Sequence, residues 1–366
     1  MDFNTLFETD ETPRDRAVLE SLRESGIPVV LYGAAADVAD QIVRKLSCNQ
    51  IPVAGVVHDE DAPLMTASTV LLKEAETFGP EALDERFPSY NVIIGFVKGY
   101  GRSSAIAAKF KHVKQVAYLS EIFDMEAIDL SFVRRNRAFL EDLYENMQDQ
   151  RSKDSLVAYL LSKTRQDMKY LPPVFDRNQY FPEGVFELSG HESYFDCGAF
   201  TGDTVADFLR ATGGSYRHIW AVEPDRANYE QLKTFVREEK LARTEIVNRG
   251  IYGFAGRLPF QEKGSMLSMI SEHADCSIEV DTVDRIAGDR PVTYLKMDVE
   301  GVELMALKGA EQTIRRNRPV LGISIYHRER DLVDIPAYIK EIVPEYTFHF
   351  RVHKKIAIDA VLYAII

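Results

Sequence analysis

Between residues 194 and 325, short apolar runs alternate with segments of helical periodicity, and this alternation constrains the fold more than any other feature of the chain. Apolar runs bounded by turn signals indicate buried strands, and the amphipathic segments between them indicate helices. Strict alternation predicts a parallel, doubly wound sheet. The expected elements are strand 194–197, helix 204–209, strand 218–222, helix 227–236, strand 245–248, strand 293–297, helix 302–314 and strand 320–325.

Two further apolar segments, 346–352 and 356–364, end the chain and are joined by His353-Lys354-Lys355. This short link forces the two strands antiparallel, because a parallel return needs a crossover of about a dozen or more residues. We therefore expect an α/β domain over residues 171–366 whose doubly wound sheet ends in a closing antiparallel strand pair.

The first 120 residues repeat the alternation on a smaller scale, in the order of a Rossmann-like α/β domain. Its first turn reads Gly33-Ala-Ala-Ala36-Asp37-Val38, where a dinucleotide fingerprint would also need glycine at 35 and 38. We interpret residues 1–120 as a Rossmann-like accessory domain that acts as a scaffold, a substrate carrier or a homo-oligomerisation module. A working nucleotide site is the alternative, and Asp59 at the end of the second strand favours it.

Residues 121–170 change to helical spacing, with Phe139, Leu140, Leu143 and Met147 on one face. We expect a helical connector here. The Pro- and aromatic-rich stretch that follows marks the start of the second domain. A chain of 366 residues is long enough for two such domains, each with its own core.

Composition excludes several classes of function. A net charge of -13 repels nucleic-acid phosphates, so we expect no nucleic-acid partner. The longest apolar runs fall far short of the ~20 residues that span a bilayer, and the acidic amino terminus does not read as a secretory signal. Three widely separated cysteines lack the spacing of zinc or disulfide frameworks. These features predict a cytoplasmic protein without a membrane span.

The strongest chemical signal is a strand-to-helix turn in the segment YFDCGAFTGD, residues 194–203. Gly198 and Gly202 follow Asp196 there. Glycine is needed where a ligand must approach the backbone more closely than a Cβ permits, or where φ is positive. The next strand ends in AVEPD, which places Glu223 27 residues beyond Asp196. A carboxylate at that position can accept hydrogen bonds from both hydroxyls of a ribose.

A third segment, LKMDVEGVELMALKGA at residues 295–310, carries acidic residues directly after a strand. Asp298 and Glu300 lie at the carboxyl edge of the expected sheet, where open α/β folds bind ligands, and a helix begins at Gly301. Together with DCGAFTGDT, AVEPD and SIYH, this block resembles the FkbM family of methyltransferases. The resemblance covers about residues 178–366, and the third block is its most specific part.

This resemblance implies a class I methyltransferase fold that binds S-adenosylmethionine. The methionine end of the cofactor would lie over residues 198–202 and its ribose on Glu223, while Asp196 would help to hold the amino acid part. The cofactor-binding residues expected on this basis are Asp196, Gly198, Ala199, Thr201, Gly202 and Glu223. Asp298, Glu300 and His327 match positions near the transferred methyl group.

O-methylation is an in-line displacement that needs alignment of the reactants and a base for the hydroxyl proton. We favour His327 as this base because its unperturbed pKa of about 6.5 suits proton transfer at neutral pH, and Asp298 is the second candidate. Asp298 and Glu300 could instead cap the helix that starts at Gly301, which is the role we assign to Glu303. Asp298, Glu300 and His327 could also bind magnesium or manganese, but we assign no metal.

We therefore expect an enzyme that methylates a hydroxyl of a small molecule or glycan, with specificity set by the segment from Gly250 to Glu279. Two other functions stay open. One is an NAD-dependent oxidoreductase that uses the N-terminal domain. The other is a non-catalytic binding module of a biosynthetic complex.

Overall fold

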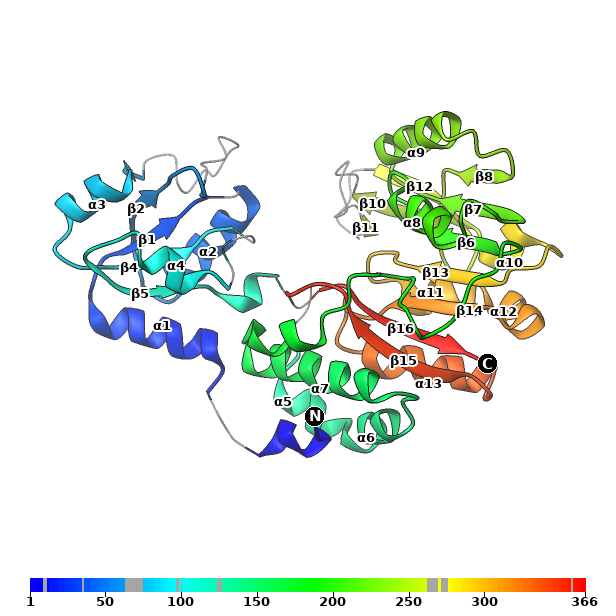
Figure 1. Ribbon diagram of the computed structural model, residues 1–366, viewed down its shortest axis with the longest axis horizontal. Helices are drawn as coiled ribbons and strands as arrows, with labels where there is room; N and C mark the ends of the chain where they lie inside the picture. The colour runs from blue at the N-terminus through cyan, green and yellow to red at the C-terminus, as the bar shows by residue number, and fades with distance from the viewer. Residues whose placement is uncertain are drawn as a thin grey trace. The chain divides into compact units, whose positions relative to one another are not determined.

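The computed structural model describes residues 1–8, 12–34, 36–62, 75–96, 99, 101–123, 127–261, 269–270, 276–356 and 358–366. The chain forms two compact units (Figure 1). The larger unit comprises Met1–Leu6, Met125–Leu160 and Leu171–Ile366, and the smaller unit comprises Phe7–Asp124 and Leu161–Tyr170. Most of residues 121–170, which we expected to form a separate helical connector, belong to the larger unit.

A seven-stranded sheet forms the centre of the larger unit. Its strands are β6 (Ser193–Cys197), β7 (His218–Val222), β8 (Thr244–Val247), β13 (Tyr294–Met297), β14 (Val320–Ser324), β15 (Thr347–Val352) and β16 (Ala360–Ile365). The spatial order is β15-β16-β14-β13-β6-β7-β8, with β16 antiparallel to both of its neighbours and the other pairs parallel. The predicted doubly wound sheet with a closing antiparallel pair is confirmed.

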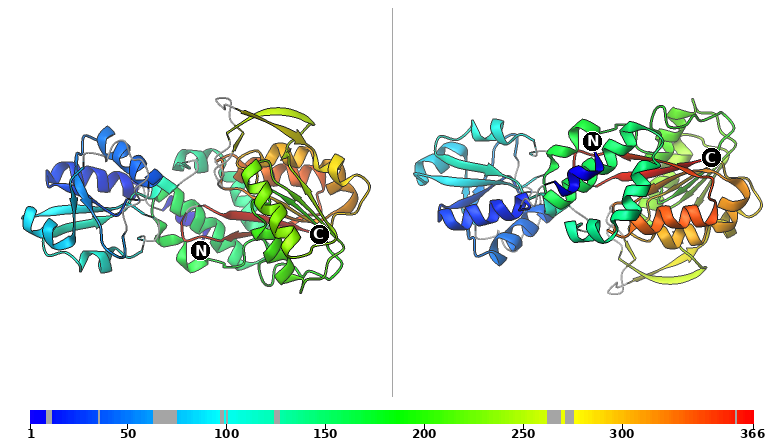
Figure 2. Two further views of the ribbon diagram at one scale, coloured as in Figure 1. Left: turned by 90° about the horizontal axis from the view of Figure 1, so that it is seen from above. Right: turned by 90° about the horizontal axis from the view of Figure 1, so that it is seen from below.

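Helices cover both faces of this sheet. They are α8 (Asp203–Ala211), α9 (Arg226–Glu238), α10 (Val283–Ala287), α11 (Glu303–Lys308), α12 (Glu311–Asn317) and α13 (Asp331–Ile342). The views in Figure 2 place α8 and α9 on one face and α11, α12 and α13 on the other. Because β6, β13 and most of β7 and β14 are buried, their sequences are apolar almost throughout.

The single helix expected over 302–314 is broken into α11 and α12 at Gly309. The carbonyl oxygen of Tyr252 approaches so closely there that it would lie 2.2 Å from a Cβ on Gly309. A contact between segments far apart in the sequence therefore requires glycine at this break.

A second sheet in the larger unit follows β8. Its strands are β9 (Gly250–Ile251), β10 (Gly256–Gln261), β11 (Met269–Ile270) and β12 (Cys276–Asp281), in the order β11-β10-β12-β9. The strand β10 pairs antiparallel with both β11 and β12. The segment expected to govern acceptor specificity lies in this sheet, and its residues 262–268 and 271–275 are outside the described part of the chain.

Three helices precede the main sheet, as the helical spacing predicted. They are α5 (Leu130–Arg135), α6 (Arg137–Glu145) and α7 (Gln150–Arg165). The start of α7 is fastened to β15, because Ser152 accepts a hydrogen bond from the amide of Phe350 (3.0 Å) and Asp149 lies 3.0 Å from the guanidinium of Arg351. At the amino terminus, the ring of Phe3 packs 5.6 Å from that of Tyr144 in α6.

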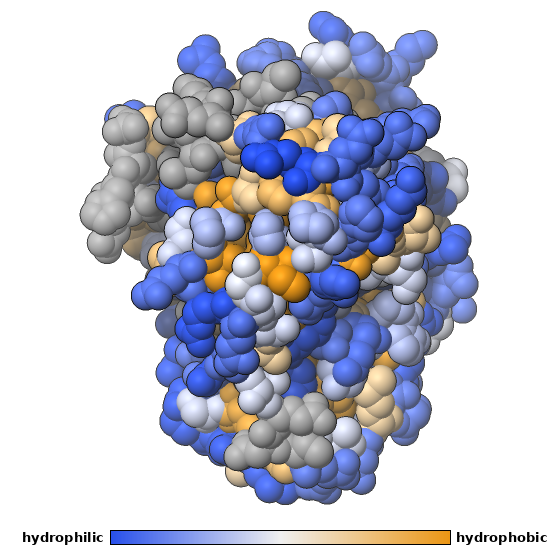
Figure 3. All heavy atoms as spheres, turned by 90° about the vertical axis from the view of Figure 1, so that its left-hand side faces the viewer, coloured by the Kyte–Doolittle hydropathy of each residue, from blue (hydrophilic) through white to orange (hydrophobic). Residues whose placement is uncertain are grey.

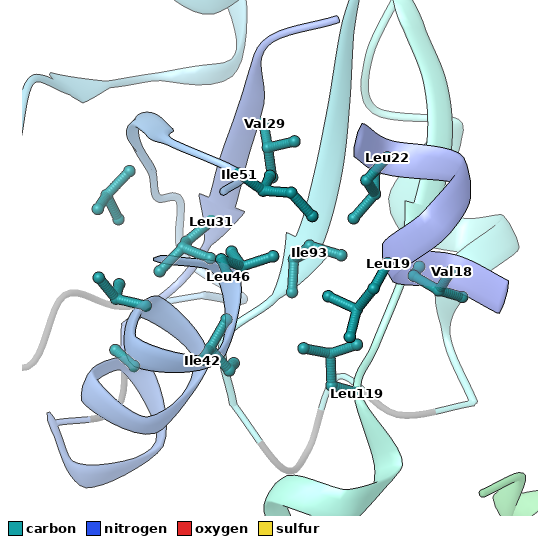
Figure 4. Packing of buried hydrophobic residues seen from close by; sticks show 14 of the residues in the cluster. Val18, Leu19, Leu22, Val29, Leu31, Ile42, Leu46, Ile51, Ile93 and Leu119 are labelled. Atoms are coloured by element: carbon teal, nitrogen blue, oxygen red, sulfur yellow. The ribbon is translucent and has the colours of Figure 1, made fainter. Parts of the chain in front are cut away.

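The smaller unit contains a five-stranded parallel sheet in the order β3-β2-β1-β4-β5. Its elements are α1 (Arg14–Ser25), β1 (Val29–Tyr32), α2 (Ala36–Cys48), β2 (Val53–Val57), β3 (Thr77–Phe78), α3 (Pro80–Arg86), β4 (Tyr90–Ile94), α4 (Ser103–Ala107) and β5 (Val113–Ala117). Figure 4 shows aliphatic side chains from two helices meeting those of the sheet, with Leu46 between Leu31 and Ile93 and with Leu19 beside Ile93. The Rossmann-like arrangement matches the alternation in the sequence.

Hydrophilic side chains occupy most of the coloured surface on the face seen in Figure 3, with apolar residues confined to smaller patches. This distribution fits a chain of net charge -13. Within the described residues, the helices are too short or too polar to cross a bilayer.

Candidate active site

The turn that follows β6 is tied to the neighbouring strands of the sheet. The amide of Gly198 donates to the carbonyl of Val222 at the end of β7 (3.0 Å). Positive φ angles recur along the turn, at Gly198 (84°), Phe200 (47°) and Gly202 (99°). A Cβ on Gly198 would lie 1.9 Å from the carbonyl oxygen of Asp298, so only glycine fits at this position.

A buried ion pair supports this turn from inside the sheet. Lys296 Nζ lies 3.0 Å from Asp196 Oδ1, and the register of β13 and β6 places the two residues side by side. Their side chains are 2% and 0% exposed. Lys296 also donates to the carbonyl of Gly198 (2.6 Å), and the hydroxyl of Thr204 donates to Asp196. Burial would lower the pKa of Lys296, but Asp196 and then Asp298 outweigh it and raise the pKa, so the lysine is charged.

Glu223 lies directly after β7 with its carboxylate fixed in orientation. Its Oε2 accepts a hydrogen bond from the amide of Phe200 and its Oε1 accepts one from the amide of Asp225, both at 3.0 Å. Burial raises the pKa of Glu223 to about 7, although these hydrogen bonds oppose the shift. The carboxylate is therefore held in place and titrates near neutral pH.

These groups surround a cavity of about 250 Å³ at the carboxyl edge of the sheet. Open α/β sheets bind ligands at this edge, where the loops after neighbouring parallel strands separate. The cavity is lined by Gln179, Tyr180, Gly198, Phe200, Asp203, Thr204, Val222, Glu223, Pro224, Asn228, Arg249, Gly250, Ile251, Phe260, Ile278, Lys296, Asp298, Val299, Glu300, Val302, Tyr326, Lys354, Ile358 and Asp359.

A cluster of acid–base groups, Asp298, Glu300 and His327, borders the cavity after β13 and β14. His327 Nε2 lies 3.6 Å from Asp298 Oδ1 and 3.4 Å from Glu300 Oε2. Its Nδ1 lies 3.0 Å from Oε1 of Glu303. The imidazole is 2% exposed, whereas the side chains of Asp298 and Glu300 are 20% and 21% exposed. The two carboxylates thus line the cavity, with the imidazole buried against them.

The hydroxyls of two tyrosines approach the Asp298 carboxylate. Tyr180 donates to Oδ2 (2.7 Å), and the hydroxyl of Tyr326 lies 3.4 Å from Oδ1. The backbone next to this cluster is strained, because Glu300 has a φ of 57°, in the region that favours glycine. The cluster is therefore held in a defined arrangement by its surroundings.

Burial and neighbouring charge shift the pKa values of this cluster in different directions. Burial would raise the pKa of Asp298, but the charges of His327 and Lys296 hold it below its usual value. Burial raises the pKa of Glu300, and Asp298 adds to this. Burial would lower the pKa of His327, but the surrounding carboxylates, Glu303 foremost, hold it well above 6.5. The upward shift means that the unperturbed pKa that favoured His327 as the base does not apply.

Residues 196–350 match the family model for the methyltransferase FkbM domain. This part of the chain is an FkbM methyltransferase domain. A crystal structure of methyltransferase FkbM from Methylobacillus flagellatus KT is similar with a TM-score of 0.74 and 23% sequence identity, covering 96% of this chain and 93% of that one. At that identity, the similarity establishes the fold.

Two other solved structures are much less similar to this chain. A methyltransferase from Geobacter sulfurreducens has a TM-score of 0.30 and 15% identity, covering 65% of this chain and 89% of that one. Aeropyrum pernix fibrillarin, with natively bound S-adenosyl-L-methionine, has a TM-score of 0.33 and 14% identity, covering 50% of this chain and 71% of that one. No curated protein matches the chain in sequence.

All residues of the site expected from sequence lie within the FkbM domain, but they occupy different positions in it. Gly198, Glu223, Asp298 and Glu300 line the cavity. The others support these residues: Asp196 and Ala199 are fully buried, Thr201 is half-buried in the turn, Gly202 caps α8, and His327 is buried against the carboxylates.

Sequence reasoning did not identify several residues of the cavity wall as site residues, among them Tyr180, Arg249, Tyr326 and Lys354. Tyr326 stands beside His327 in SIYH, so its position was a usable signal. Tyr180 lies in the Pro- and aromatic-rich stretch after residue 170, which we interpreted only as the start of the second domain. Arg249 and Lys354 follow strands without a motif that would single them out.

In the smaller unit, Asp59 is engaged by its own neighbours. Its carboxylate accepts hydrogen bonds from the hydroxyl of Tyr32 (2.8 Å) and the amides of Asp61 (2.9 Å) and Ala62 (3.0 Å), and Lys109 Nζ lies 2.7 Å away. Burial would raise the pKa of Asp59, but Lys109 and Tyr32 lower it. A ribose would have to displace these bonds. Ala35, in the turn where a dinucleotide fingerprint needs glycine, lies outside the described residues.

We expect Lys296→Met to reduce the free energy of unfolding of the larger unit by about 3–5 kcal/mol, because it leaves the charge of Asp196 buried without a partner. Lys233→Met is the matched control, since Lys233 belongs to an exposed pair with Glu230 and should change stability by less than about 0.5 kcal/mol. Trp220, the single tryptophan, is buried in β7, so its fluorescence during urea unfolding reports on this unit. Equal stability of the two variants would contradict the prediction.

Proposed function

We propose that the FkbM domain transfers a methyl group from S-adenosylmethionine to a hydroxyl group of a small molecule or glycan. The observation that carries the proposal is that Glu223, the turn at Gly198 and the carboxylates of Asp298 and Glu300 line one cavity. A carboxylate suited to a ribose thus shares a cavity with carboxylates suited to a hydroxyl acceptor.

The residues on one side of the cavity fit the cofactor. Glu223 has lone pairs left after its backbone hydrogen bonds and would accept hydrogen bonds from the two ribose hydroxyls. The turn at Gly198 exposes backbone without a Cβ, and Asp196 acts through Lys296 to keep it in shape. When bound, S-adenosylmethionine supplies an electrophilic sulfonium methyl group.

On the other side of the cavity, Asp298 and Glu300 would bind the acceptor hydroxyl and take its proton. Tyr180 fixes the Asp298 carboxylate, and the ring of His327 packs between the two carboxylates, with Nε2 3.6 Å from Asp298 and 3.4 Å from Glu300. A nucleophile oriented in this way gains most of its reactivity from alignment. His327 is therefore a positioning residue in this proposal.

The direct test is calorimetric titration of the purified chain with S-adenosylhomocysteine and, separately, with NADH. We expect S-adenosylhomocysteine to bind with micromolar affinity in the wild type, and Glu223→Ala to lose that binding. Binding of NADH without S-adenosylhomocysteine would place the active centre in the smaller unit and overturn the proposal. Cofactor binding without transfer to any hydroxyl acceptor would favour a non-catalytic binding module.

The affinity for S-adenosylhomocysteine should depend on pH through Glu223. The ionised carboxylate accepts the ribose hydroxyls, and its pKa is about 7 in the free protein. Protonation therefore competes with binding below pH 7, and the dissociation constant should rise up to about thirtyfold between pH 8 and pH 5.5. Glu223→Gln should bind weakly with little pH dependence over this range. A wild-type affinity for S-adenosylhomocysteine that does not change between pH 8 and pH 5.5 would exclude this role for Glu223.

The proposal extends to the partners of the chain. We propose that the acceptor is not a nucleic acid, since a net charge of -13 opposes phosphate binding, and that the protein works in the cytoplasm. The smaller unit would act as a scaffold, a carrier or a homo-oligomerisation module, because Asp59 is already engaged.

A further inference from the structure

We infer that Asp298, Glu300 and His327 bind one divalent transition-metal cation of the Mn²⁺ or Zn²⁺ type at the acceptor side of the cavity. The inference deepens the proposed function and rests on it for the role of the cation in acceptor activation. The site itself is argued from the geometry of the three side chains.

The spacing of the three groups suits a shared ion. One ligand atom from each residue lies within 4.8 Å of the others. His327 Nε2 is 3.4 Å from Glu300 Oε2 and 3.6 Å from Asp298 Oδ1, longer than a good hydrogen bond. Ligands about 2.0–2.1 Å from a tetrahedral metal lie roughly 3.4 Å from one another. The cluster therefore has about the dimensions of a coordination sphere.

The buried imidazole provides a second, independent observation. The side chain of His327 is 2% exposed, and across the described residues neither of its ring nitrogens has a hydrogen-bond partner of good geometry. A buried ring nitrogen without a partner is costly, so its presence needs an explanation. Nε2 is directed at the two carboxylates that line the cavity, which is where a cation would satisfy it.

Glu303 stands where metal sites have an outer carboxylate. Its Oε1 lies 3.0 Å from His327 Nδ1, and the same oxygen accepts a hydrogen bond from the amide of Val299 (2.9 Å). Histidine ligands usually donate their other ring nitrogen to such a carboxylate, which fixes the tautomer and directs the lone pair to the metal. Glu303 is 0% exposed, so it is well placed for this role and is a positioning residue.

The donor set decides the class of cation. Mg²⁺ and Ca²⁺ prefer oxygen ligands, whereas a set of one imidazole and two carboxylates suits Mn²⁺ and Zn²⁺. Three protein ligands leave positions free, as in catalytic metal sites. A hydroxyl bound at a free position would lose its proton more easily. In the overall transfer, the acceptor oxygen forms a bond to the methyl carbon and the carbon–sulfur bond breaks, giving a methyl ether and S-adenosylhomocysteine. The hydroxyl proton passes to the second oxygen of the Asp298 or Glu300 carboxylate, since each carboxylate offers one oxygen to the ion.

The test is titration of the purified full-length chain with Co²⁺, a spectroscopic probe for such sites, followed by visible absorption and calorimetry. We expect one Co²⁺ per chain, with binding at least tenfold weaker in Glu300→Gln and in His327→Gln. Glu303→Gln should weaken binding about tenfold to a hundredfold, as outer carboxylates do. Glu223→Gln is the matched control, because it lies in the same cavity outside the cluster and should keep Co²⁺ while losing affinity for S-adenosylhomocysteine.

The outcomes separate this inference from the proposed function. A wild-type chain that binds S-adenosylhomocysteine but not Co²⁺ overturns the metal site alone. Co²⁺ binding that is unchanged in Glu300→Gln and His327→Gln overturns it as well, because the ion then sits elsewhere. Co²⁺ binding that is weakened by Glu300→Gln and His327→Gln supports the site, even if S-adenosylhomocysteine fails to bind. If His327→Gln does not fold, as judged by Trp220 fluorescence, the Co²⁺ affinity of Glu300→Gln is compared with that of the wild type instead.

Discussion

Gly198→Ala should abolish measurable binding of S-adenosylhomocysteine, a loss of more than about a hundredfold, or about 2.7 kcal/mol. The new Cβ would lie 1.9 Å from the carbonyl oxygen of Asp298, a backbone atom that cannot rotate away. The turn and the end of β13 must then move apart, and both belong to the cavity wall. Overpacking and a positive φ together should also lower the free energy of unfolding by about 2–4 kcal/mol.

Gly214→Ala separates the steric effect from the conformational one. Gly214 has a φ of 78°, close to the 84° of Gly198, but a Cβ there meets no atom within 4 Å. This variant should lose about 1 kcal/mol of stability and keep its affinity for S-adenosylhomocysteine. The measurements are calorimetric titration and urea unfolding followed by Trp220 fluorescence. Equal affinity of the two variants would mean that the close approach at Gly198 does not shape the cofactor site.

Asp298→Asn should lower turnover at least roughly a hundredfold, the usual contribution of a positioned base or of a group that orients the nucleophile. The substitution keeps the shape of the side chain and an oxygen that can accept from Tyr180, but it removes the negative charge beside His327. Binding of S-adenosylhomocysteine should change little. We expect His327→Ala to reduce turnover to a similar extent. Without the imidazole beside them, the carboxylates of Asp298 and Glu300 lose the group that positions them.

Turnover can be measured with methyl-labelled S-adenosylmethionine and the first hydroxyl acceptor found by screening. Asp289→Asn is the control, since this carboxylate lies in the same domain with its side chain fully exposed and should leave the rate unchanged. Near-wild-type turnover in both Asp298→Asn and His327→Ala would move the acceptor chemistry away from this cluster.

The main sheet was predictable because its central strands are buried and mostly apolar, with the paired Asp196 and Lys296 as exceptions. The second sheet was not, because β9 and β11 each span two residues and show no periodicity. The requirement for glycine at the break between α11 and α12 was equally hidden, since it comes from the distant carbonyl of Tyr252. Local patterns thus predicted the elements that long hydrophobic segments build, and missed those that distant contacts create.

The same distinction applies to the candidate site. Glu223, Asp298 and Glu300 were found because the carboxyl ends of neighbouring parallel strands meet at one edge. Tyr180 was missed because its bond to Asp298 joins residues 118 positions apart. The position of His327 was predictable but the upward shift of its pKa was not, because the shift depends on Glu303, which is buried beside the ring.

The first residues of the chain have a practical consequence for dissecting this protein. Phe3 and Leu6 are buried in the larger unit, and Asn4 accepts a hydrogen bond from Arg137 (2.9 Å), whereas the chain that follows builds the smaller unit. In topological terms, Phe7–Asp124, the main part of the smaller unit, is inserted between two segments of the larger one, and Leu161–Tyr170 completes the smaller unit. A truncation that starts near residue 171 would remove Phe3, α6 and the bond from Ser152 to β15. Excising residues 7–124 and joining residue 6 to residue 125 by a flexible linker would keep these contacts. The ligand binding and turnover of the larger unit could then be measured without the main part of the smaller unit.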